Sequence, residues 1–456
     1  MKLLKGRTTW AGAAALAIAS AAGASFVGGH AHGDTVPPAP FPTPIQHVVI
    51  IYQENHSFDE TLGQICQDVV NGAPRCDGAT TGKTHTGAVI PLKRSPDVVP
   101  FVVHNTSAQT KAIDGGKMDG FDTIGGCGGG TACYTQYYPD QIPNLAALAR
   151  KFVISDRTFS QDSVPSWGGH LNLVAATLDG FDGNNPGGGP GWGCDSGGTA
   201  NWRATPTSPW MTVKSCVPDQ QGHGAAGATT PVQWVPTIMD HLDSAGRTWN
   251  LYVSPKSATG HTWSICPTFA DCLYTSQATH MKAPSTIVTD AQGGNLPNFA
   301  IVTPSGPTGA TSQHNQASMI KGDNWIGQMV QAIESGPQWS STAIFITYDD
   351  CGCFYDHVPP AAGLGIRLPM VIVSPYAKAG TTDHNVASTA SMLAYAEHVL
   401  GVQPLNERDG SAYDYSGSFD YTQTVTPAVP MQQSVLPAAS QQYLATHPST
   451  AADDDT

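Results

Sequence analysis

The 456-residue sequence predicts an α/β fold in which a mostly parallel central sheet is sandwiched between helices. Three observations predict it: short apolar runs typical of buried strands, segments with helical spacing between them, and the alternation of the two along most of the chain. Strands that alternate with helices form β-α-β units, which give a parallel sheet with helices on both faces.

Six apolar runs are predicted as strands. The first, IQHVVIIYQ at residues 45–53, is almost continuously apolar, as expected of a strand that is buried on both faces. The other predicted strands span residues 153–159, 248–254, 298–304, 342–350 and 369–375. The predicted helices span residues 142–152, 235–242, 325–333 and 389–400, and residues 166–178 read as a strand-end loop that leads into a helix.

The N-terminus has the pattern of a secretory signal peptide, residues 1–24. Three basic residues within the first seven precede an Ala-rich apolar run at 11–22, and small residues allow cleavage near Ala24. That run is too short to span a bilayer, and no later run is long enough. We therefore expect a secreted or periplasmic protein whose mature chain has no transmembrane segment.

Beyond the signal peptide the chain divides into three parts. A Pro-rich leader at 25–44 precedes one large domain at 45–420, and a C-terminal tail, expected to be loosely structured, spans 421–456. Within the domain, residues 179–233 are rich in Gly, Pro, Asn and Ser and are predicted as an insertion. Only 12% of the residues are charged, and the net charge of −14 argues against nucleic acid as a partner, because phosphate backbones are bound by Lys and Arg.

The ten cysteines fall into pairs of sequence neighbours. Disulfides persist outside the cytoplasm, so we expect local bridges that staple the loop-rich insertions, although the sequence alone does not fix their connectivity. The neighbouring pairs are 66/76, 127/133, 194/216, 266/272 and 351/353.

Polar side chains follow three of the predicted strands at the points where the strands end. Glu54 and Asn55 follow the first strand, Ser166 lies beyond the second, and Asp349 and Asp350 end the strand at 342–350. Ligands bind outside the carboxyl ends of strands in open α/β sheets, so these side chains are candidates for one site. Carboxylate and amide oxygens suit Mg²⁺, Mn²⁺, Ca²⁺ or Zn²⁺, and a serine beside such an ion can act as a nucleophile.

Five blocks, in order, resemble the motifs of a bacterial phosphoesterase family that includes non-haemolytic-type phospholipase C enzymes and an acid phosphatase. The resemblance covers about residues 45–410. It implies an alkaline phosphatase-like fold, with a metal at the edge of the sheet. The blocks are HVVIIYQENHSFDETLG (47–63), GGKMDGF (115–121), PSWGGH (165–170), FITYDDCGCFYDHVPP (345–360) and GIRLPMVIVSPYAKAG (365–380).

The resemblance also implies a chemistry: a serine attacks a phosphoester, and water then hydrolyses the covalent phospho-enzyme. Ser166 matches the nucleophile, which also contacts the metal. Glu54 and Asn55 match the first metal-binding pair. Asp349 and Asp350 match the second pair, with Asp350 in place of the commoner Glu.

Three histidines match family positions near the phosphate. His104 precedes GGKMDGF, and His314 lies in SQHNQAS. Both are expected to contact the phosphoryl group or to protonate the leaving oxygen. His357, in YDHVPP, has two interpretations: a catalytic role, with Asp356 orienting its ring, or a structural role in bracing the loop after the strand.

Two further departures from the family pattern bear on the site. Gly168, Gly169 and His170 replace Pro-Asn-Arg after the nucleophile, which predicts a more flexible loop and removes an arginine contact to phosphate. Cys351 and Cys353 stand where relatives carry His and Gly. We expect these thiols to be oxidised, to each other or to distant partners, and not to bind the metal.

The resemblance leaves the substrate open. The leading interpretation is phospholipase C-type hydrolysis of a phospholipid, at a membrane surface, or of a related phosphoester. The alternatives are an acid phosphatase acting on phosphomonoesters and, in another class, a secreted binding protein that keeps the fold without catalysis. Trp192, Trp202 and Trp210 could make the insertion a membrane-touching or substrate-covering surface, or the insertion could be a disulfide-stapled surface loop.

Overall fold

The computed structural model describes residues 43–447, except 128–130, 190, 255, 257–260 and 307–310. The predicted signal peptide, its cleavage site near Ala24, most of the Pro-rich leader and the end of the C-terminal tail lie outside these residues. No helix within the described residues combines the length and the apolar character that crossing a bilayer requires.

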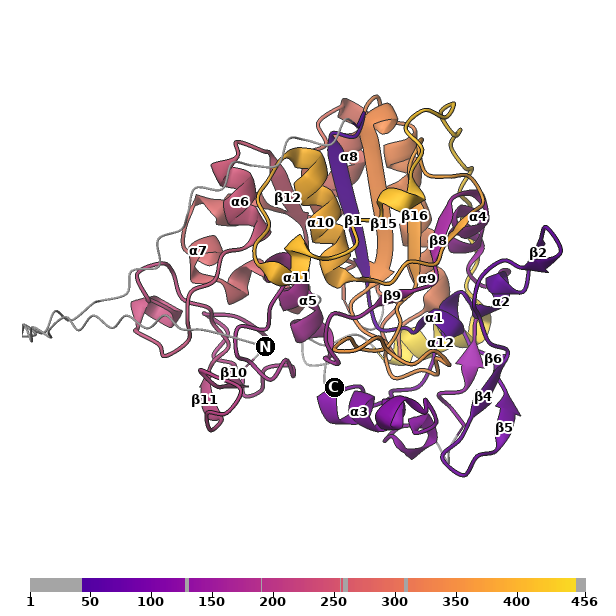
Figure 1. Cartoon of the computed structure of the whole chain (residues 1–456), viewed down its shortest axis with the longest axis horizontal. Helices are drawn as coiled ribbons and strands as arrows, with labels where there is room; N and C mark the ends of the chain where they lie inside the picture. The colour runs from indigo at the N-terminus through magenta and orange to yellow at the C-terminus, as the bar shows by residue number, and fades with distance from the viewer. Residues whose placement is uncertain are drawn as a thin grey trace, which may run out of the picture. The chain divides into compact units, whose positions relative to one another are not determined.

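One eight-stranded sheet forms the centre of the domain. Its strands are β1 His47–Gln53, β8 Val153–Ser155, β12 Trp249–Tyr252, β13 Met281–Lys282, β14 Phe299–Val302, β15 Thr342–Tyr348, β16 Met370–Val373 and β17 Thr382–Asp383. They are ordered β13-β12-β14-β1-β15-β16-β8-β17, and β1 lies in the interior of the sheet with every residue buried (Figure 1). The near-continuous apolar run of β1 is explained by this position, because both of its faces are covered.

The sheet is mostly parallel, as predicted. β1 pairs in parallel with β14 on one side and with β15 on the other, and Gln53 lies opposite Tyr348 at the end of the second pairing. The exception is β16, which is antiparallel to both β15 and β8. No crossover helix joins β15 to β16, and a strand that returns directly along its neighbour is necessarily antiparallel to it.

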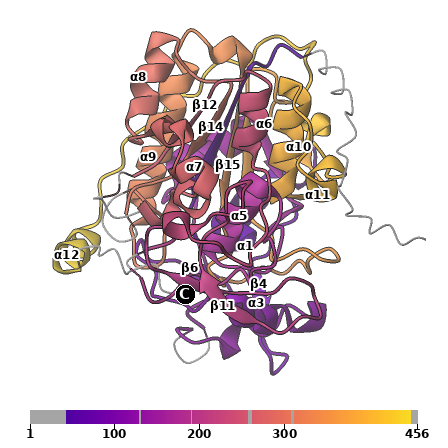
Figure 2. The ribbon, with the colours of Figure 1, turned by 90° about the vertical axis from the view of Figure 1, so that its left-hand side faces the viewer.

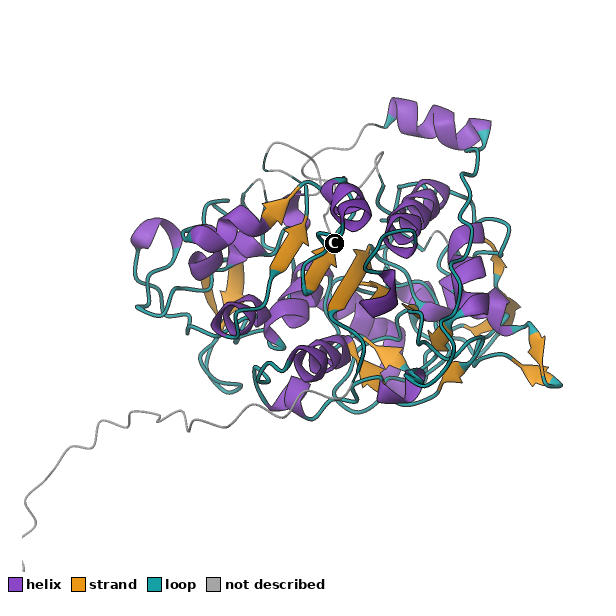
Figure 3. Ribbon diagram, turned by 90° about the horizontal axis from the view of Figure 1, so that it is seen from above, coloured by secondary structure: helices purple, strands orange, loops and turns teal. Residues whose placement is uncertain are grey.

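Helices cover both faces of the sheet, which confirms the predicted layers (Figures 2 and 3). Figure 2 shows α8 and α9 on one side and α5, α6 and α10 on the other, and α4 packs against α9. The bounds of these helices are α4 Pro143–Lys151, α5 Ser166–Ala175, α6 Ile238–Ser244, α8 Thr286–Gly293, α9 Met319–Glu334 and α10 Thr389–Leu400.

The predicted strand at 153–159 is two short strands. β8 ends at Ser155, and β9, Thr158–Phe159, resumes after a turn and pairs with β18, Ala387–Ser388, in a separate small sheet. Asp156 and Arg157 form this turn, and a charged pair inside an otherwise apolar run is the sequence signal for the break.

Short hairpins and helices fill the loops around the sheet. In Figure 1, α1, α3 and α5 lie towards the end of the sheet at which β1 finishes. The remaining strands are β2 Val69–Val70, β3 Ala73–Pro74, β4 Thr81–Lys83, β5 Val89–Pro91, β6 Lys93–Arg94, β7 Thr135–Gln136, β10 Thr199–Trp202 and β11 Met211–Lys214. The remaining α-helices are α1 Phe58–Thr61, α2 Gly63–Cys66, α3 Thr106–Ile113, α7 Ala270–Leu273, α11 Glu407–Gly410 and α12 Ala438–Thr446.

Four of the five predicted cysteine pairs are disulfide bridges, and each closes a local loop. They join Cys66 to Cys76, Cys127 to Cys133, Cys194 to Cys216 and Cys266 to Cys272. The fifth prediction is wrong: Cys351 and Cys353 are buried free thiols whose sulfur atoms lie 4.0 Å apart.

The insertion at 179–233 contains the β10–β11 hairpin, which the Cys194–Cys216 bridge ties to the loop before it. Its tryptophans have different surroundings. Trp192 and Trp202 are buried, whereas Trp210 is 48% exposed and is covered on one face by the guanidinium of Arg203, 4.3 Å from the ring centre.

The C-terminal tail is more ordered than predicted. Gln432 exchanges hydrogen bonds with Asn144 on α4, and Ser434 does the same with Asn324 on α9. The last helix of the described residues is α12. Polar side chains of α4 and α9 therefore hold this part of the tail in place. They lie 110 or more positions away in sequence, so a local sequence pattern cannot show these contacts.

Candidate active site

The site begins where β1 and β15 end. Because these strands are parallel and in register at Gln53 and Tyr348, the residues that follow them, Glu54 and Asp349, lie side by side. The Asp349 backbone N–H donates to the Gln53 carbonyl at 3.0 Å, which continues the ladder one residue beyond the strands. Both carboxylates are fully buried.

Asn55 links the two strand ends to the rest of the site. Its backbone has φ +49°, a left-handed conformation that Asn tolerates better than most residues, and its N–H donates to Asp349 Oδ1 at 3.2 Å. The side-chain Nδ2 lies within hydrogen-bonding distance of His104 Nε2, at 2.8 Å, of Asp350 Oδ2, at 3.0 Å, and of Ser166 Oγ, at 3.2 Å, and its two N–H groups are shared among these acceptors. Within the described residues, the buried Oδ1 of this amide has no hydrogen-bond partner.

Ser166 is the first residue of α5 and faces the carboxylates. Its Oγ lies 3.3 Å from Glu54 Oε2 and 3.4 Å from Asp350 Oδ2. The N-terminus of a ten-residue helix carries a partial positive charge, which favours an anion such as an ionised serine or a phosphoryl group.

The prediction of a flexible loop after Ser166 is wrong, because Gly168 and Gly169 are buried residues inside α5. A Cβ on Gly169 would lie 2.6 Å from the backbone oxygen of Asp349, and a Cβ on Gly168 would lie 2.6 Å from the Cβ of Val164. The Tyr52 hydroxyl also donates to the Gly169 carbonyl at 3.2 Å. Gly169 lets α5 lie close to the residue that follows β15, on the side where Ser166 Oγ faces Asp350.

The Cys351–Gly352–Cys353 segment is a tight turn beneath Asn55. Gly352 has φ +54°, and a Cβ there would lie 2.1 Å from the Asn55 carbonyl oxygen. Its N–H donates to Asp350 Oδ1 at 2.6 Å, while the Cys353 N–H donates to Cys351 Sγ at 3.2 Å. The thiols occupy this buried turn as packed side chains, and burial raises the pKa of Cys351 well above its ordinary value.

His104 and His314 lie on the other side of Asn55, with ring centres 5.9 Å apart. His104 Nδ1 donates to the Val102 carbonyl at 2.7 Å, so its Nε2 is the acceptor of the Asn55 hydrogen bond. His314 Nδ1 donates to the Asn315 carbonyl at 2.9 Å, and its ring stacks on Trp263 at 6.2 Å. The structure therefore brings both histidines beside the serine and carboxylate cluster.

His357 belongs to a different cluster. Its Nδ1 lies 2.6 Å from Asp59 Oδ2 and its Nε2 lies 3.0 Å from Asp77 Oδ1. Burial alone would lower the pKa of His357, but the hydrogen bond and the charge of Asp59 outweigh it and raise the pKa to about 9. The partner that orients the ring is Asp59, not the neighbouring Asp356 predicted from the sequence.

Arg367 is the centre of this second cluster, and the sequence did not reveal it. The guanidinium is fully buried and donates to both oxygens of Asp356, at 3.2 and 3.1 Å, and to Asp59 Oδ1 at 3.1 Å. Asp59 follows β1 and Asp356 follows β15, so one cation ties together the two segments that carry the site. Asp59 is 308 positions from Arg367, and only the fold shows that they pair.

His170 is a second residue that the prediction left out. It lies on α5 four residues after Ser166, and its Nε2 is 3.5 Å from Glu54 Oε1. The signal was present in PSWGGH, because residues four apart on a helix share a face.

The cluster around Ser166 is suited to a divalent cation. Three buried carboxylates, Glu54, Asp349 and Asp350, converge there, and the Asn55 Oδ1 adds an amide oxygen. Buried carboxylates need positive charge beside them, and oxygen donors of this kind bind hard divalent ions. Burial, together with these three carboxylates, raises the pKa of Tyr52 well above its ordinary value, so the hydroxyl keeps its proton.

Among the residues that the structure describes, two groups have ligand atoms spaced for a metal ion. One is Glu54, His170 and Asp349, and the other is Asp59, Asp356 and His357. In the second group the Arg367 guanidinium already contacts both aspartates at about 3.1 Å, so a cation is in place. The first group lies within the Ser166 cluster.

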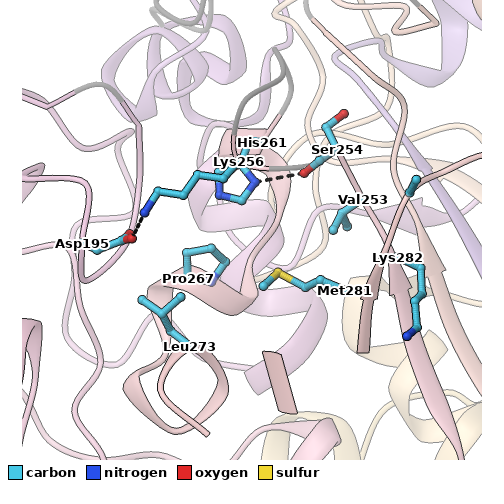
Figure 4. A pocket seen from close by; sticks show the side chains of 10 residues that line it. Asp195, Val253, Ser254, Lys256, His261, Pro267, Leu273, Met281 and Lys282 are labelled. Carbon is cyan, nitrogen blue, oxygen red and sulfur yellow. Dashed lines mark hydrogen bonds and ion pairs between the residues drawn. The ribbon is translucent and has the colours of Figure 1, made fainter. Parts of the chain in front are cut away.

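A cavity of about 170 Å³ lies at the carboxyl ends of β12 and β13 (Figure 4). Lys256 pairs with Asp195 at its edge, and His261 Nδ1 donates to the Ser254 carbonyl at 2.9 Å. Apolar side chains, among them Met281, form much of its lining. No predicted site residue lines this cavity, so we assign it no part in the site.

The sequence profile of the Phosphoesterase family matches residues 45–403. The chain belongs to this family. The five motif blocks of the sequence fall within the match, and so do Glu54, Ser166 and Asp349. The family assignment predicted from those blocks is confirmed.

Curated relatives of this Phosphoesterase family member are phospholipases. Non-specific phospholipase C3 from Arabidopsis thaliana is 22% identical over 398 residues, which cover 75% of this chain and 65% of the relative. Non-hemolytic phospholipase C from Burkholderia pseudomallei (strain K96243) is 26% identical over 414 residues, which cover 77% of this chain and 55% of the relative. The chain thus spans about two thirds or less of these relatives.

Solved structures show a more distant likeness. A protein of the alkaline phosphatase superfamily from Vibrio parahaemolyticus matches 84% of this chain and 74% of its own, with a TM-score of 0.37 and 13% identity. The crystal structure of Ps i-CgsB matches 82% of this chain and 76% of its own, with a TM-score of 0.40 and 9% identity.

Proposed function

We propose that this member of the Phosphoesterase family is a metal-dependent phosphoester hydrolase with Ser166 as nucleophile, and that its reaction is of the phospholipase C type. One observation carries the proposal: Ser166 Oγ, at the N-terminus of α5, lies within 3.4 Å of Glu54 and Asp350 in a buried cluster. The names of the curated relatives support a phospholipid as the substrate.

Glu54, Asn55, Asp349, Asp350 and the Ser166 hydroxyl would hold the metal. The donor set fits, because it combines buried carboxylates with an amide oxygen that lacks a protein hydrogen bond within the described residues. A divalent ion held there withdraws negative charge from the phosphoryl oxygens and favours the ionised serine.

The first step forms the bond between Ser166 Oγ and phosphorus and breaks the bond between phosphorus and the leaving oxygen. The serine proton passes to one of the carboxylates that Oγ already faces, Glu54 or Asp350. The positive end of α5 stabilises the charge that spreads over the phosphoryl oxygens.

The two histidines have different roles in this proposal. The Nε2 of His104 accepts a hydrogen bond from the Asn55 amide, so His104 acts in its neutral form and positions Asn55. We assign proton donation to the leaving oxygen to His314, whose ring stacks on Trp263 and lies 5.9 Å from the His104 ring. Diacylglycerol leaves when the substrate is a phospholipid.

The second step returns the serine. Water attacks phosphorus and gives a proton to His314, the bond between phosphorus and Ser166 Oγ breaks, and the serine regains its proton from the carboxylate while the phosphorylated headgroup leaves. His357 takes no part in either step in this proposal. It positions the segment after β15 through its contacts with Asp59 and Asp77.

We also propose that the protein is exported. The signal-like N-terminus and the four disulfide bridges support this, because disulfides are rare in the cytoplasm. A binding protein without catalysis is the weaker alternative, because the contacts of Ser166 with Asn55 and Glu54, and of Asn55 with Asp350, support a catalytic cluster.

Hydrolysis assays test the function directly. We expect the full chain to release diacylglycerol from phosphatidylcholine vesicles and to lose this activity in a chelator. Ser166→Ala lowers kcat/KM by at least about a thousandfold, because it removes the nucleophile. The matched control is Ser163→Ala, three residues earlier and half-buried, which keeps the activity.

Substrate choice decides between the enzyme classes. If 4-nitrophenyl phosphate is hydrolysed and phosphatidylcholine is not, the protein is a phosphomonoesterase and the phospholipase assignment is wrong. If neither is hydrolysed with Mg²⁺, Mn²⁺, Ca²⁺ or Zn²⁺, the enzyme assignment itself is wrong.

A further inference from the structure

His170 lies where α5 passes closest to the end of β1. It is fully buried, one helical turn after Ser166 and on the same face of the helix. Its imidazole is held by two aromatic rings, the edge of Tyr52 at 5.0 Å and Trp192 at 6.2 Å between ring centres. Position and orientation are thus fixed by the packing of α5 and of the insertion that carries Trp192.

The imidazole joins two carboxylates from different strand ends. One ligand atom each from Glu54, His170 and Asp349 lies within 4.8 Å of the others, and His170 Nε2 lies 3.5 Å from Glu54 Oε1. Ligand atoms about 2.0–2.2 Å from a shared ion lie about 3–4 Å apart. The three ligand atoms lie up to 4.8 Å apart, so the side chains have to move inward by up to about 1 Å to share one ion.

Glu54 is not the only carboxylate beside His170. Asp349, which follows β15 and not β1, also has a carboxylate oxygen within 4.8 Å of the His170 ligand atom. Gly169, the residue before His170, is the point at which α5 lies against the Asp349 backbone. The close approach of the helix therefore delivers the imidazole to both carboxylates at once.

We propose that His170 is a ligand of the divalent ion, so that the site prefers Zn²⁺ over Mg²⁺ and Ca²⁺. The inference rests on the metal-dependent site of the proposed function and names an additional ligand for it. Imidazole nitrogen binds Zn²⁺ well, whereas Mg²⁺ and Ca²⁺ take oxygen ligands. Replacing imidazole by a side-chain amide therefore weakens Zn²⁺ binding far more than Mg²⁺ binding.

Calorimetric titration of the chelator-stripped full chain tests this without reference to activity. We expect His170→Gln to weaken Zn²⁺ binding at least about 100-fold and Mg²⁺ binding less than about 3-fold. The control is His241→Gln, which changes a histidine of α6 whose Nδ1 donates to the Gln403 carbonyl, and which keeps both affinities. Equal Zn²⁺ affinity in the wild type and in His170→Gln overturns the inference.

X-ray absorption of the zinc-loaded wild type is the second measurement, and it does not depend on the folding of a variant. An imidazole nitrogen shell at about 2.0–2.1 Å supports the inference, and an oxygen-only shell overturns it. Hydrolysis is assayed on the same preparations. A wild type that binds Zn²⁺ as expected but hydrolyses no phosphoester supports the inference and contradicts the proposed function, so the two failures are distinguishable.

Discussion

The two histidines beside Ser166 differ in what surrounds their rings. The Asn55 amide donates to His104, whereas an indole face covers His314. In the proposed mechanism His314 is the proton donor, so a leaving group that needs no proton should depend on it less.

We therefore expect His314→Gln to act selectively. Its kcat/KM falls at least about 100-fold for phosphatidylcholine, whose leaving alkoxide needs a proton, and less than about 10-fold for a 4-nitrophenyl ester, whose phenolate leaves without one. Parallel assays of both substrates measure the ratio. Equal losses on the two substrates would show that His314 supports the structure and is not the proton donor.

The free thiols of Cys351 and Cys353 give a second prediction at this scale. Both side chains are fully buried and the other eight cysteines are bridged, so a thiol reagent should modify no cysteine in the native protein. In denaturant it should modify two per chain. Titration with Ellman's reagent measures both numbers, and no reaction in denaturant would mean that the pair is oxidised after all.

At the residue level, the sequence indicated the groups that lie next to strand ends and missed those whose partners are distant. Glu54 and Asp349 could be predicted because each follows a long apolar strand. Arg367 could not, since its partners Asp59 and Asp356 are brought to it only by the fold. His170 lay between these cases: it was visible as a helix neighbour of Ser166, but the sequence did not show that its ring lies beside Glu54.

The packing of α5 against β15 is the element-level feature that assembles the site. The approach depends on Gly169, because any side chain there meets the Asp349 backbone at 2.6 Å. Backbone cannot move aside as the end of a flexible side chain can, so the helix itself has to shift.

Gly169→Ala should therefore impair catalysis and stability together. We expect a loss of about 1–3 kcal/mol in the free energy of unfolding, typical of overpacking, and at least about a tenfold lower kcat/KM, because Ser166 moves with the helix. The control is Gly187→Ala, where an added Cβ meets nothing within 4 Å. A variant with wild-type kinetics would show that α5 tolerates the displacement.

At the level of helices and strands, the sequence could predict the elements that are long apolar runs and that stand apart from their neighbours. The strands at β1, β15 and β14 were long apolar runs and were found within a few residues of their ends. The direction of β16 was not predictable, because an apolar run reads the same in either orientation. The hairpins of two- and three-residue strands carry too little pattern to be recognised.

Across the whole domain, the Arg367 cluster connects the segments after β1 and β15, and it should make stability depend on pH. The pKa of His357 is about 9 in the folded protein, above its ordinary value near 6.5. A raised pKa of this kind gives stability that is complete below about pH 6.5 and is lost as the pH rises through 9.

Denaturant unfolding between pH 6 and pH 10, with the disulfides intact, tests this dependence. Deprotonation of His357 should lower the free energy of unfolding of the wild type by no more than about 3 kcal/mol between pH 6 and pH 10. The His357→Gln variant should be less stable than the wild type at pH 6. Its free energy of unfolding should lack the part of the pH dependence that comes from His357. Parallel curves for the wild type and the variant would contradict the assignment.

The interior position of β1 has a consequence for how the chain folds as it is made. β1 pairs with β14 and β15, whose residues follow it by about 250 and 300 positions. At a synthesis rate of about 5–20 residues per second, β1 waits roughly 15–60 s for its second partner. Both edges of this apolar strand stay unpaired until β14 has been made, and one edge stays unpaired until β15 follows, so the first strand of the sheet to be synthesised is among the last to be fully paired.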